Sequence, residues 1–149
     1  MLLPGSGPPP RVANEMGLTY VDITARNPGD RSRRVTIPQL MVDTGSELTW
    51  IPGIVLEGIG IEPEKLRSFV LADRSRIKRP VGFAILELGR HRTIDEVVFG
   101  EREDLTLLGA HSLEGFGLSI DPQSHRLRAT PTIAAQNLVP TRRLRSSRP

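Results

Sequence analysis

The sequence of 149 residues contains no cysteine. This absence excludes disulfide bonds, thiol catalysis and thiolate metal sites, and it leaves the redox compartment open. No apolar run has the length of a membrane span, and the first residues include no apolar stretch of signal-peptide length. We therefore expect a cytoplasmic protein without a membrane partner, and the chain length favours one domain rather than two.

Histidine is also scarce, and the three copies are His91, His111 and His125. Their spacing is not typical of a metal site, so we assign them to surface or turn positions. The segment GIGIEP contains glycines, but no Lys-Ser or Lys-Thr follows it, which excludes a P-loop for phosphate. We therefore predict neither a metal nor another cofactor.

Basic residues give the chain a formal net charge of +3, but they are unevenly distributed. Six arginines and no acidic residue follow position 125, so the rest of the chain is mildly acidic. We interpret residues 132–149 as a basic, flexible tail, and nucleic-acid binding through it is the less favoured alternative. At the other end, the Pro- and Gly-rich residues 1–15 cannot bury enough apolar surface to fold, so we predict a disordered leader.

Between these ends, residues 16–131 contain short β-branched runs separated by turn clusters, a pattern typical of a small all-β barrel or sandwich. Pro38 indicates an edge or a bulge within its strand. A helical turn at residues 55–58 is one possible element, and a short helix at residues 110–114 should end at a left-handed Gly115. The predicted strands cover residues 18–27, 35–42, 67–72, 78–88, 92–99, 105–108, 118–121 and 126–130.

Two apolar strands end abruptly at a glycine-containing turn, namely LMVDTGS at residues 40–46 and LTLLGAHSL at residues 105–113. Asp, Thr and Gly are ordinary turn residues, so the first motif alone has a purely structural explanation. The pair, in this order within an all-β pattern, resembles the retropepsin-like aspartic proteases of the single-lobe type. The resemblance covers roughly residues 18–121. It implies an all-β, retropepsin-like acid protease barrel with one short helix near its C-terminal end.

This resemblance implies an aspartic endopeptidase that uses two carboxylates. Two like charges in contact cannot both ionise, so the pair shares one proton. One carboxylate takes a proton from the attacking water, and the other donates a proton to the scissile carbonyl. Because the chain has one Asp-Thr-Gly motif, we expect a homodimer in which each copy contributes Asp43, with a polypeptide as substrate. The alternative is a catalytically silent dimeric module that binds an extended peptide in the same cleft.

The resemblance also assigns roles within the first motif. Asp43 is the catalytic carboxylate, and the Thr44 hydroxyl bonds to the partner loop across the dyad. Gly45 lacks a side chain, so the dyad and the substrate can approach closely. Ser46 donates a hydrogen bond to the carboxylate.

The second motif and a hairpin complete the expected site. Leu107 and Leu108 pack beneath the active-site loop, and Gly109 lets the chain cross behind it. The hairpin of residues 67–88 occupies the position of the flap that closes over substrate. Its tip consists of Ala72, Asp73, Arg74 and Ser75.

Some residues depart from the family pattern or have simpler roles. The flap tip often contains glycine in the family and does not here. Retroviral members pair an arginine after the late glycine with an acid near the first motif. Here the acid, Glu47, is present but the basic position is Ala110, so that interface bond is missing and dimer stability should depend more on apolar burial and the terminal strands. Trp50 is either core or subsite wall, Asp121 opens a turn, and residues 95–96 form the polar side of a strand.

Overall fold

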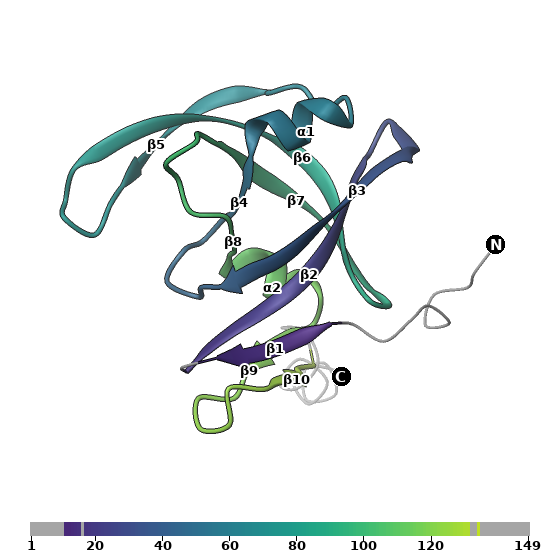
Figure 1. The fold of residues 1–149 in the computed structure, drawn as a ribbon, viewed down its shortest axis with the longest axis vertical. Coiled ribbons are helices and arrows are strands. Elements are labelled where there is room, and N and C mark those ends of the chain that lie inside the picture. Colours follow the sequence, from purple (N-terminus) through teal and green to yellow (C-terminus); the bar gives the residue numbers. More distant parts are fainter. Residues whose placement is uncertain (1–10, 16, 132–133, 135–149) are drawn as a thin grey trace, which may run out of the picture.

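The computed structural model describes residues 11–15, 17–131 and 134. These residues form a mostly β fold with two short helices (Figure 1). The strands are β1 (Val12–Glu15), β2 (Leu18–Asn27), β3 (Asp30–Val42), β4 (Thr49–Pro52), β5 (Lys65–Val70), β6 (Arg76–Leu88), β7 (His91–Gly100), β8 (Leu107–Leu108), β9 (Leu118–Ile120) and β10 (Leu127–Ala129). The helices are α1 (Gly53–Gly58) and α2 (Ala110–Gly115). In the described part of the chain, neither helix is long and apolar enough to cross a membrane.

Eight strands form one sheet in the order β1-β2-β3-β8-β4-β7-β6-β5, and β9 pairs with β10 in a two-stranded sheet. β2 also pairs with β6, so the large sheet bends back on itself around its interior (Figure 1). Most neighbours are antiparallel, but β8 runs parallel to β3, and β4 runs parallel to β7. Parallel neighbours need crossover connections, and these bring the short β8 between β3 and β4.

Strand β2 shows the alternation that its sequence predicts. Thr19, Val21, Ile23 and Ala25 are all buried, whereas the residues between them are partly exposed. This face packs into the main apolar core, which consists largely of aliphatic residues from β2, β3, β6 and β7. The alternating residues therefore give β2 one buried face.

The bulge expected at Pro38 is also present. The register between β2 and β3 shifts between Val21 and Ile23, which leaves Pro38 and Gln39 out of the regular pairing. Gln39 has a φ of 55°, and its backbone N–H donates to Oδ1 of Asp22 at 3.0 Å. Proline has no N–H to donate to the ladder, so it is compatible with a strand at such an interruption.

A second, smaller apolar cluster lies apart from the main core. It is built on β4, β6, β7 and β8, and the hairpin of β5 and β6 packs against it. Its buried members are Leu48, Trp50, Val81, Val98 and Leu107, and the partly buried Phe69 and Ile77 contact them.

The ends of the predicted domain need one correction. Residues 1–15 are predicted as a disordered leader, but Val12–Glu15 form β1, which pairs antiparallel with β2. The side chains of β1 are all exposed, so its order comes from backbone pairing, which composition does not reveal. Residues 1–10 and, except for position 134, the predicted tail 132–149 lie outside the described residues.

Several strand and helix boundaries also differ from the prediction. β3 begins at Asp30 rather than at residue 35, because it pairs with β2 up to the turn, and the strand predicted at residues 105–108 is reduced to Leu107–Leu108. Helix α1 begins at Gly53, ahead of the predicted turn at residues 55–58, and adds a second short helix to the one predicted near the C-terminal end.

The left-handed glycine at the end of helix α2 lies two residues beyond the predicted one. The left-handed residue is Gly117, with a φ of 75°, rather than Gly115. A Cβ atom at Gly115 would lie 2.1 Å from Oγ1 of Thr93. Gly115 is therefore required for close packing of α2 against β7 rather than for its backbone angle.

Candidate active site

The two motifs lie side by side in the structure. Met41 pairs with Leu107 and Val42 pairs with Leu108 in the parallel ladder of β3 and β8. Beyond the end of β3, the backbone N–H of Asp43 donates to the carbonyl oxygen of Leu108 at 2.9 Å. Asp43 is therefore fixed at the edge of a two-strand pairing whose two leucines, Leu107 and Leu108, are both buried.

The Asp43 loop is a tight turn that closes on its own carboxylate. Oδ1 of Asp43 accepts a hydrogen bond from the N–H of Gly45 at 2.9 Å, and the Asp43 carbonyl accepts one from the N–H of Ser46 at 3.2 Å. A Cβ atom at Gly45 would lie 3.1 Å from Oδ1 of Asp43. A side chain at Gly45 would therefore crowd the Asp43 carboxylate within this turn.

Ser46 does not have its predicted partner. Its hydroxyl donates to the backbone carbonyl of Leu48 at 2.8 Å, rather than to the Asp43 carboxylate. The serine oxygen therefore stabilises the path of the chain from the loop into β4. Thr44 is exposed in the single chain, which leaves its hydroxyl accessible to another molecule.

Gly109 lies where the chain crosses behind the loop. A Cβ atom there would lie 2.4 Å from the carbonyl oxygen of Leu48, so no other residue fits without movement of the backbone. The N–H groups of Ala110 and His111 donate to the carbonyls of Ser46 and Glu47, at 2.8 and 3.0 Å. The start of α2 thereby holds the second half of the Asp43 loop.

Two buried hydroxyls that the sequence analysis missed support this crossing. Oγ1 of Thr49 accepts from the N–H of Gly109 at 3.0 Å and lies 2.7 Å from Oγ of Ser112. Both hydroxyl residues are fully buried. Thr49 lies three residues after the first motif, and Ser112 lies on the helix after the second motif. This closeness in sequence to the two motifs is only a weak signal of their role.

Asp95 of β7 lies beside Ser112, although the sequence suggests only a polar strand position. Burial raises the pKa of its carboxyl above the ordinary value, even though the hydroxyls of Ser112 and Thr93 favour the charged form. Oδ2 of Asp95 is buried without a hydrogen-bond partner among the described residues. The neighbouring Glu96 is different, because it pairs with Lys65 and Arg67 of β5.

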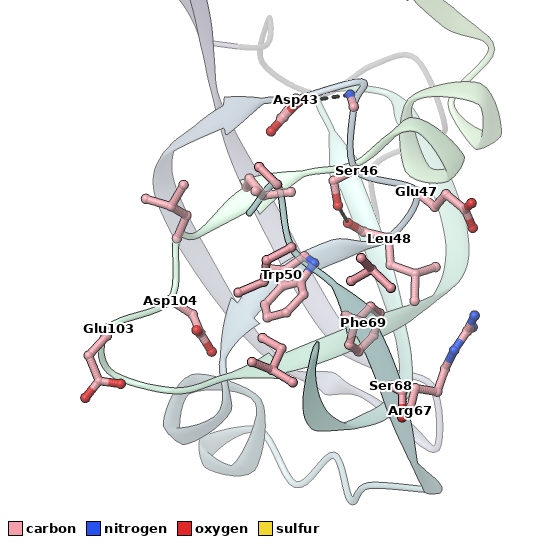
Figure 2. A pocket seen from close by; sticks show the side chains of 17 residues that line it. Asp43, Ser46, Glu47, Leu48, Trp50, Arg67, Ser68, Phe69, Glu103 and Asp104 are labelled. Carbon is pink, nitrogen blue, oxygen red and sulfur yellow. Dashed lines mark hydrogen bonds between the residues drawn. The ribbon is translucent and has the colours of Figure 1, made fainter. Parts of the chain in front are cut away.

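A pocket of about 850 Å³ extends from the Asp43 loop beneath the covering hairpin, by which we mean residues 65–80. Figure 2 shows Asp43 at the top of this pocket and the rings of Trp50 and Phe69 below it. The two rings are tilted, with centroids 5.0 Å apart. Trp50 is 9% exposed, so it is both part of the smaller apolar cluster and a wall of the pocket.

The covering hairpin contributes residues 67–72 and Ile77 to the lining of the pocket. Phe69, Leu71, Ala72 and Ile77 line the pocket, whereas the other three predicted tip residues form the turn. In this turn, Oδ1 of Asp73 accepts from the hydroxyl and the N–H of Ser75, which holds the pKa of the Asp73 carboxyl below its ordinary value. Of the predicted tip residues, only Ala72 contacts the pocket.

Charged groups surround this largely apolar space. Glu47, Arg67, Glu103 and Asp104 line the pocket together with Asp43. Among residues 11–15, 17–131 and 134, no group of three or more His, Asp or Glu side chains could hold a metal ion.

No protein-family model matches the chain, and no curated protein matches its sequence. Its function must therefore be argued from the residues and the geometry of the site.

Proposed function

We propose that this chain is one half of a homodimeric aspartic endopeptidase of the retropepsin-like, single-lobe type. The observation that carries the proposal is the position of Asp43, which is fixed by the β3–β8 pairing at one end of a pocket roofed by a hairpin. The pairing of β2 with β6, which bends the large sheet back on itself, supports the finer assignment to a small protease barrel.

Asp43 has the chemistry that this reaction needs. The Gly45 N–H donates to Oδ1, so the carboxylate keeps a fixed orientation. A second Asp43, from another copy, would create a pair of carboxylates that holds one proton, because two adjacent negative charges repel. The ionised member then takes a proton from water as the water attacks the peptide carbonyl, and the protonated member donates to the carbonyl oxygen.

The pocket supports a polypeptide substrate. Its apolar wall, formed around Trp50 and Phe69, can bury one side chain of an extended chain, while the covering hairpin excludes water from the reacting bond. The partly exposed Asp43 lies at the same pocket. Binding and hydrolysis would then occur in one continuous space.

The proposal can be tested with a denatured protein mixture, incubated with the purified protein from acidic to neutral pH. Cleavage sites are mapped by mass spectrometry for the wild type, for Asp43→Asn and for Asp121→Asn. Asp121 is a matched control, because its Oδ1 also accepts a backbone N–H in a turn, from Gln123 at 2.8 Å, and it does not line the pocket.

We expect cleavage by the wild type and by Asp121→Asn, and none by Asp43→Asn. Cleavage that persists in Asp43→Asn would contradict the proposal. Peptide binding without cleavage by the wild type would instead support the silent binding module, which uses the same pocket.

A further inference from the structure

Arg79 and Asp104 form a paired ionic contact that the proposed reaction does not use directly. Nε of Arg79 donates to Oδ2 of Asp104 at 2.7 Å, and Nη2 donates to Oδ1 at 3.0 Å. The two side chains are only 12% and 14% exposed. Two parallel bonds between a guanidinium and a carboxylate fix distance and orientation together, more strictly than one bond would.

The contact has further support on the side of Asp104. Oδ2 also accepts the backbone N–H of Glu101 at 2.7 Å, and the Glu101 carboxylate lies 3.5 Å from Nη2 of Arg79. The hydrogen bonds from Arg79 hold the pKa of Asp104 below its ordinary value, and Asp104 raises that of Arg79. Both groups therefore stay charged at neutral pH.

This pair joins two elements that share no strand pairing. Arg79 lies in β6, within the covering hairpin, where it pairs with Arg67 of β5. Asp104 lies in the loop of residues 101–106, which connects β7 to β8 and contributes Glu103, Asp104 and Leu105 to the pocket wall. The hairpin roof and the loop wall are thus connected by side chains.

The same loop leads directly to the catalytic side of the pocket. Four residues after Asp104, the carbonyl of Leu108 accepts the N–H of Asp43. Because Leu107 and Leu108 are held by their own pairing with β3, a displacement of the loop would change mainly the width of the pocket.

We propose that Arg79 and Asp104 are positioning residues that latch the covering hairpin to the wall loop and so set the width of the substrate pocket. The inference rests on the proposed function in assigning the pocket to substrate, but the latch itself can be tested without any substrate. Breaking the pair should let the hairpin move away from Trp50 and weaken substrate binding. The chemistry at Asp43 should change much less.

Trp50 provides the direct readout, because it is the only tryptophan in the chain and its ring contacts Phe69 of the hairpin. Trp50 emission and acrylamide quenching are measured without substrate in Asp104→Asn, Arg79→Gln and Arg79→Lys. Glu87→Gln is the control, since it removes the ion pairs of Glu87 with Arg26 and Arg92, which join strands that are already paired. Thermal unfolding followed by circular dichroism identifies any variant that fails to fold.

We expect a red shift of emission and stronger quenching in Asp104→Asn and Arg79→Gln, a smaller change in Arg79→Lys, and none in Glu87→Gln. Lysine can make one bond but cannot reproduce the two-bond fork. Folded Asp104→Asn and Arg79→Gln proteins whose Trp50 signals match the wild type would overturn the latch. This outcome does not depend on whether the chain is a protease.

A second readout connects the latch to substrate. In peptide cleavage, KM should rise roughly tenfold in Asp104→Asn, as loss of a charge-assisted hydrogen bond suggests, while kcat changes little. An equal loss of kcat in a folded variant, with KM unchanged, would contradict a role in pocket width. A wild type without proteolytic activity would refute the proposed function. The Trp50 fluorescence would still test whether the Arg79–Asp104 contact holds the covering hairpin in place.

Discussion

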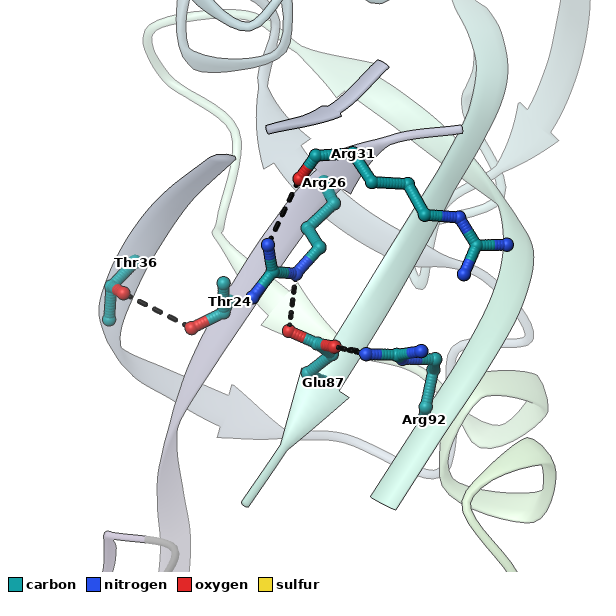
Figure 3. A network of polar contacts seen from close by, with 6 residues as sticks. All are labelled: Thr24, Arg26, Arg31, Thr36, Glu87 and Arg92. Atoms are coloured by element: carbon teal, nitrogen blue, oxygen red, sulfur yellow. Dashed lines mark hydrogen bonds and ion pairs between the residues drawn. The ribbon is translucent and has the colours of Figure 1, made fainter. Parts of the chain in front are cut away.

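Two ionic clusters lie at opposite ends of β6, and they have different structural consequences. At one end Arg79 binds Asp104, and at the other Glu87 lies between two arginines (Figure 3). Nε of Arg26 donates to Glu87 at 2.7 Å, and Nε of Arg92 donates to it at 2.8 Å. The chemistry is the same, a guanidinium on a mostly buried carboxylate.

The difference is in what each cluster joins. Glu87 and its arginines lie on β6, β2 and β7, which are already paired through backbone ladders. The Arg79–Asp104 contact instead joins the covering hairpin to a loop with which it shares no ladder. An ion pair between strands that are already paired adds stability, whereas one between unpaired elements also determines their relative position.

The largest expected difference between variants is in their catalytic activity. Asp43→Asn should lower kcat/KM by about 10²–10⁴-fold, because an amide keeps the local hydrogen bonding but cannot shuttle a proton. Glu87→Gln, at the far end of β6, should leave kcat/KM unchanged. The check is steady-state cleavage of one peptide by each purified variant. Comparable losses of kcat/KM in both variants would show that Asp43 has no special role in the reaction.

Two glycine substitutions compare the stability of the crossing behind Asp43 with that of helix α1. Gly109→Ala places a Cβ atom 2.4 Å from a backbone carbonyl, and it should cost about 3 kcal/mol in the free energy of unfolding. Gly58→Ala in α1 meets no atom within 4 Å and should stabilise by about 0.5–1 kcal/mol. Urea unfolding measures both, and a tolerated Gly109→Ala would mean that the crossing behind Asp43 is loosely packed.

The two ion pairs should respond alike to pH. Asp104→Asn and Glu87→Gln should each lower the free energy of unfolding by about 1–3 kcal/mol at neutral pH. Burial opposes the charge of Glu87, but the bonds from Arg26 and Arg92 hold its pKa below the ordinary value, as Arg79 does for Asp104. The stabilisation is thus complete above pH of about 4 to 5 and is lost as the pH falls through the lowered pKa values.

Urea titrations of the wild type and both variants at several pH values test this pattern. A difference between wild type and variant that stays constant into strong acid would exclude these carboxylates as its source. A change in Trp50 quenching in Glu87→Gln would remove the distinction between the two ends of β6.

The smallest predicted effect on stability is that of Asp95. Its ionisation destabilises the folded state, whereas that of Asp104 and Glu87 stabilises it. Its pKa is raised by burial, so its ionisation destabilises the folded state as the pH rises through and above the ordinary value. Asp95→Asn should therefore stabilise the protein at neutral pH, by less than about 1 kcal/mol after solvent screening, and the gain should vanish in acid. Destabilisation by Asp95→Asn at neutral pH, measured by urea unfolding, would contradict this account.

Sequence reasoning succeeded where a local pattern decides the structure. The one-sided burial of β2 and the bulge at Pro38 follow from residue periodicity and from the missing N–H of proline. The approach of the two apolar motifs was anticipated only through the family resemblance, and their parallel pairing is present.

The remaining features depend on tertiary packing. Arg79 and Asp104 are 25 residues apart, and nothing in their local sequence selects one partner among many charges. The hydroxyl of Ser46 turned to a backbone carbonyl rather than to Asp43, a rotamer choice that sequence does not encode locally. Strand β1 is held by backbone bonds to β2 and carries no apolar signal.

The central claim is that two copies of the chain share one active site, and dilution tests it most directly. Initial rates are measured over a wide range of protein concentration, with sedimentation to give the mass at each point. We predict that activity per chain falls as the dimer dissociates, that saturating peptide opposes the fall, and that excess Asp43→Asn protein suppresses wild-type activity through mixed dimers. Constant activity per chain while the sedimenting species becomes a monomer would contradict the shared pair of Asp43 carboxylates.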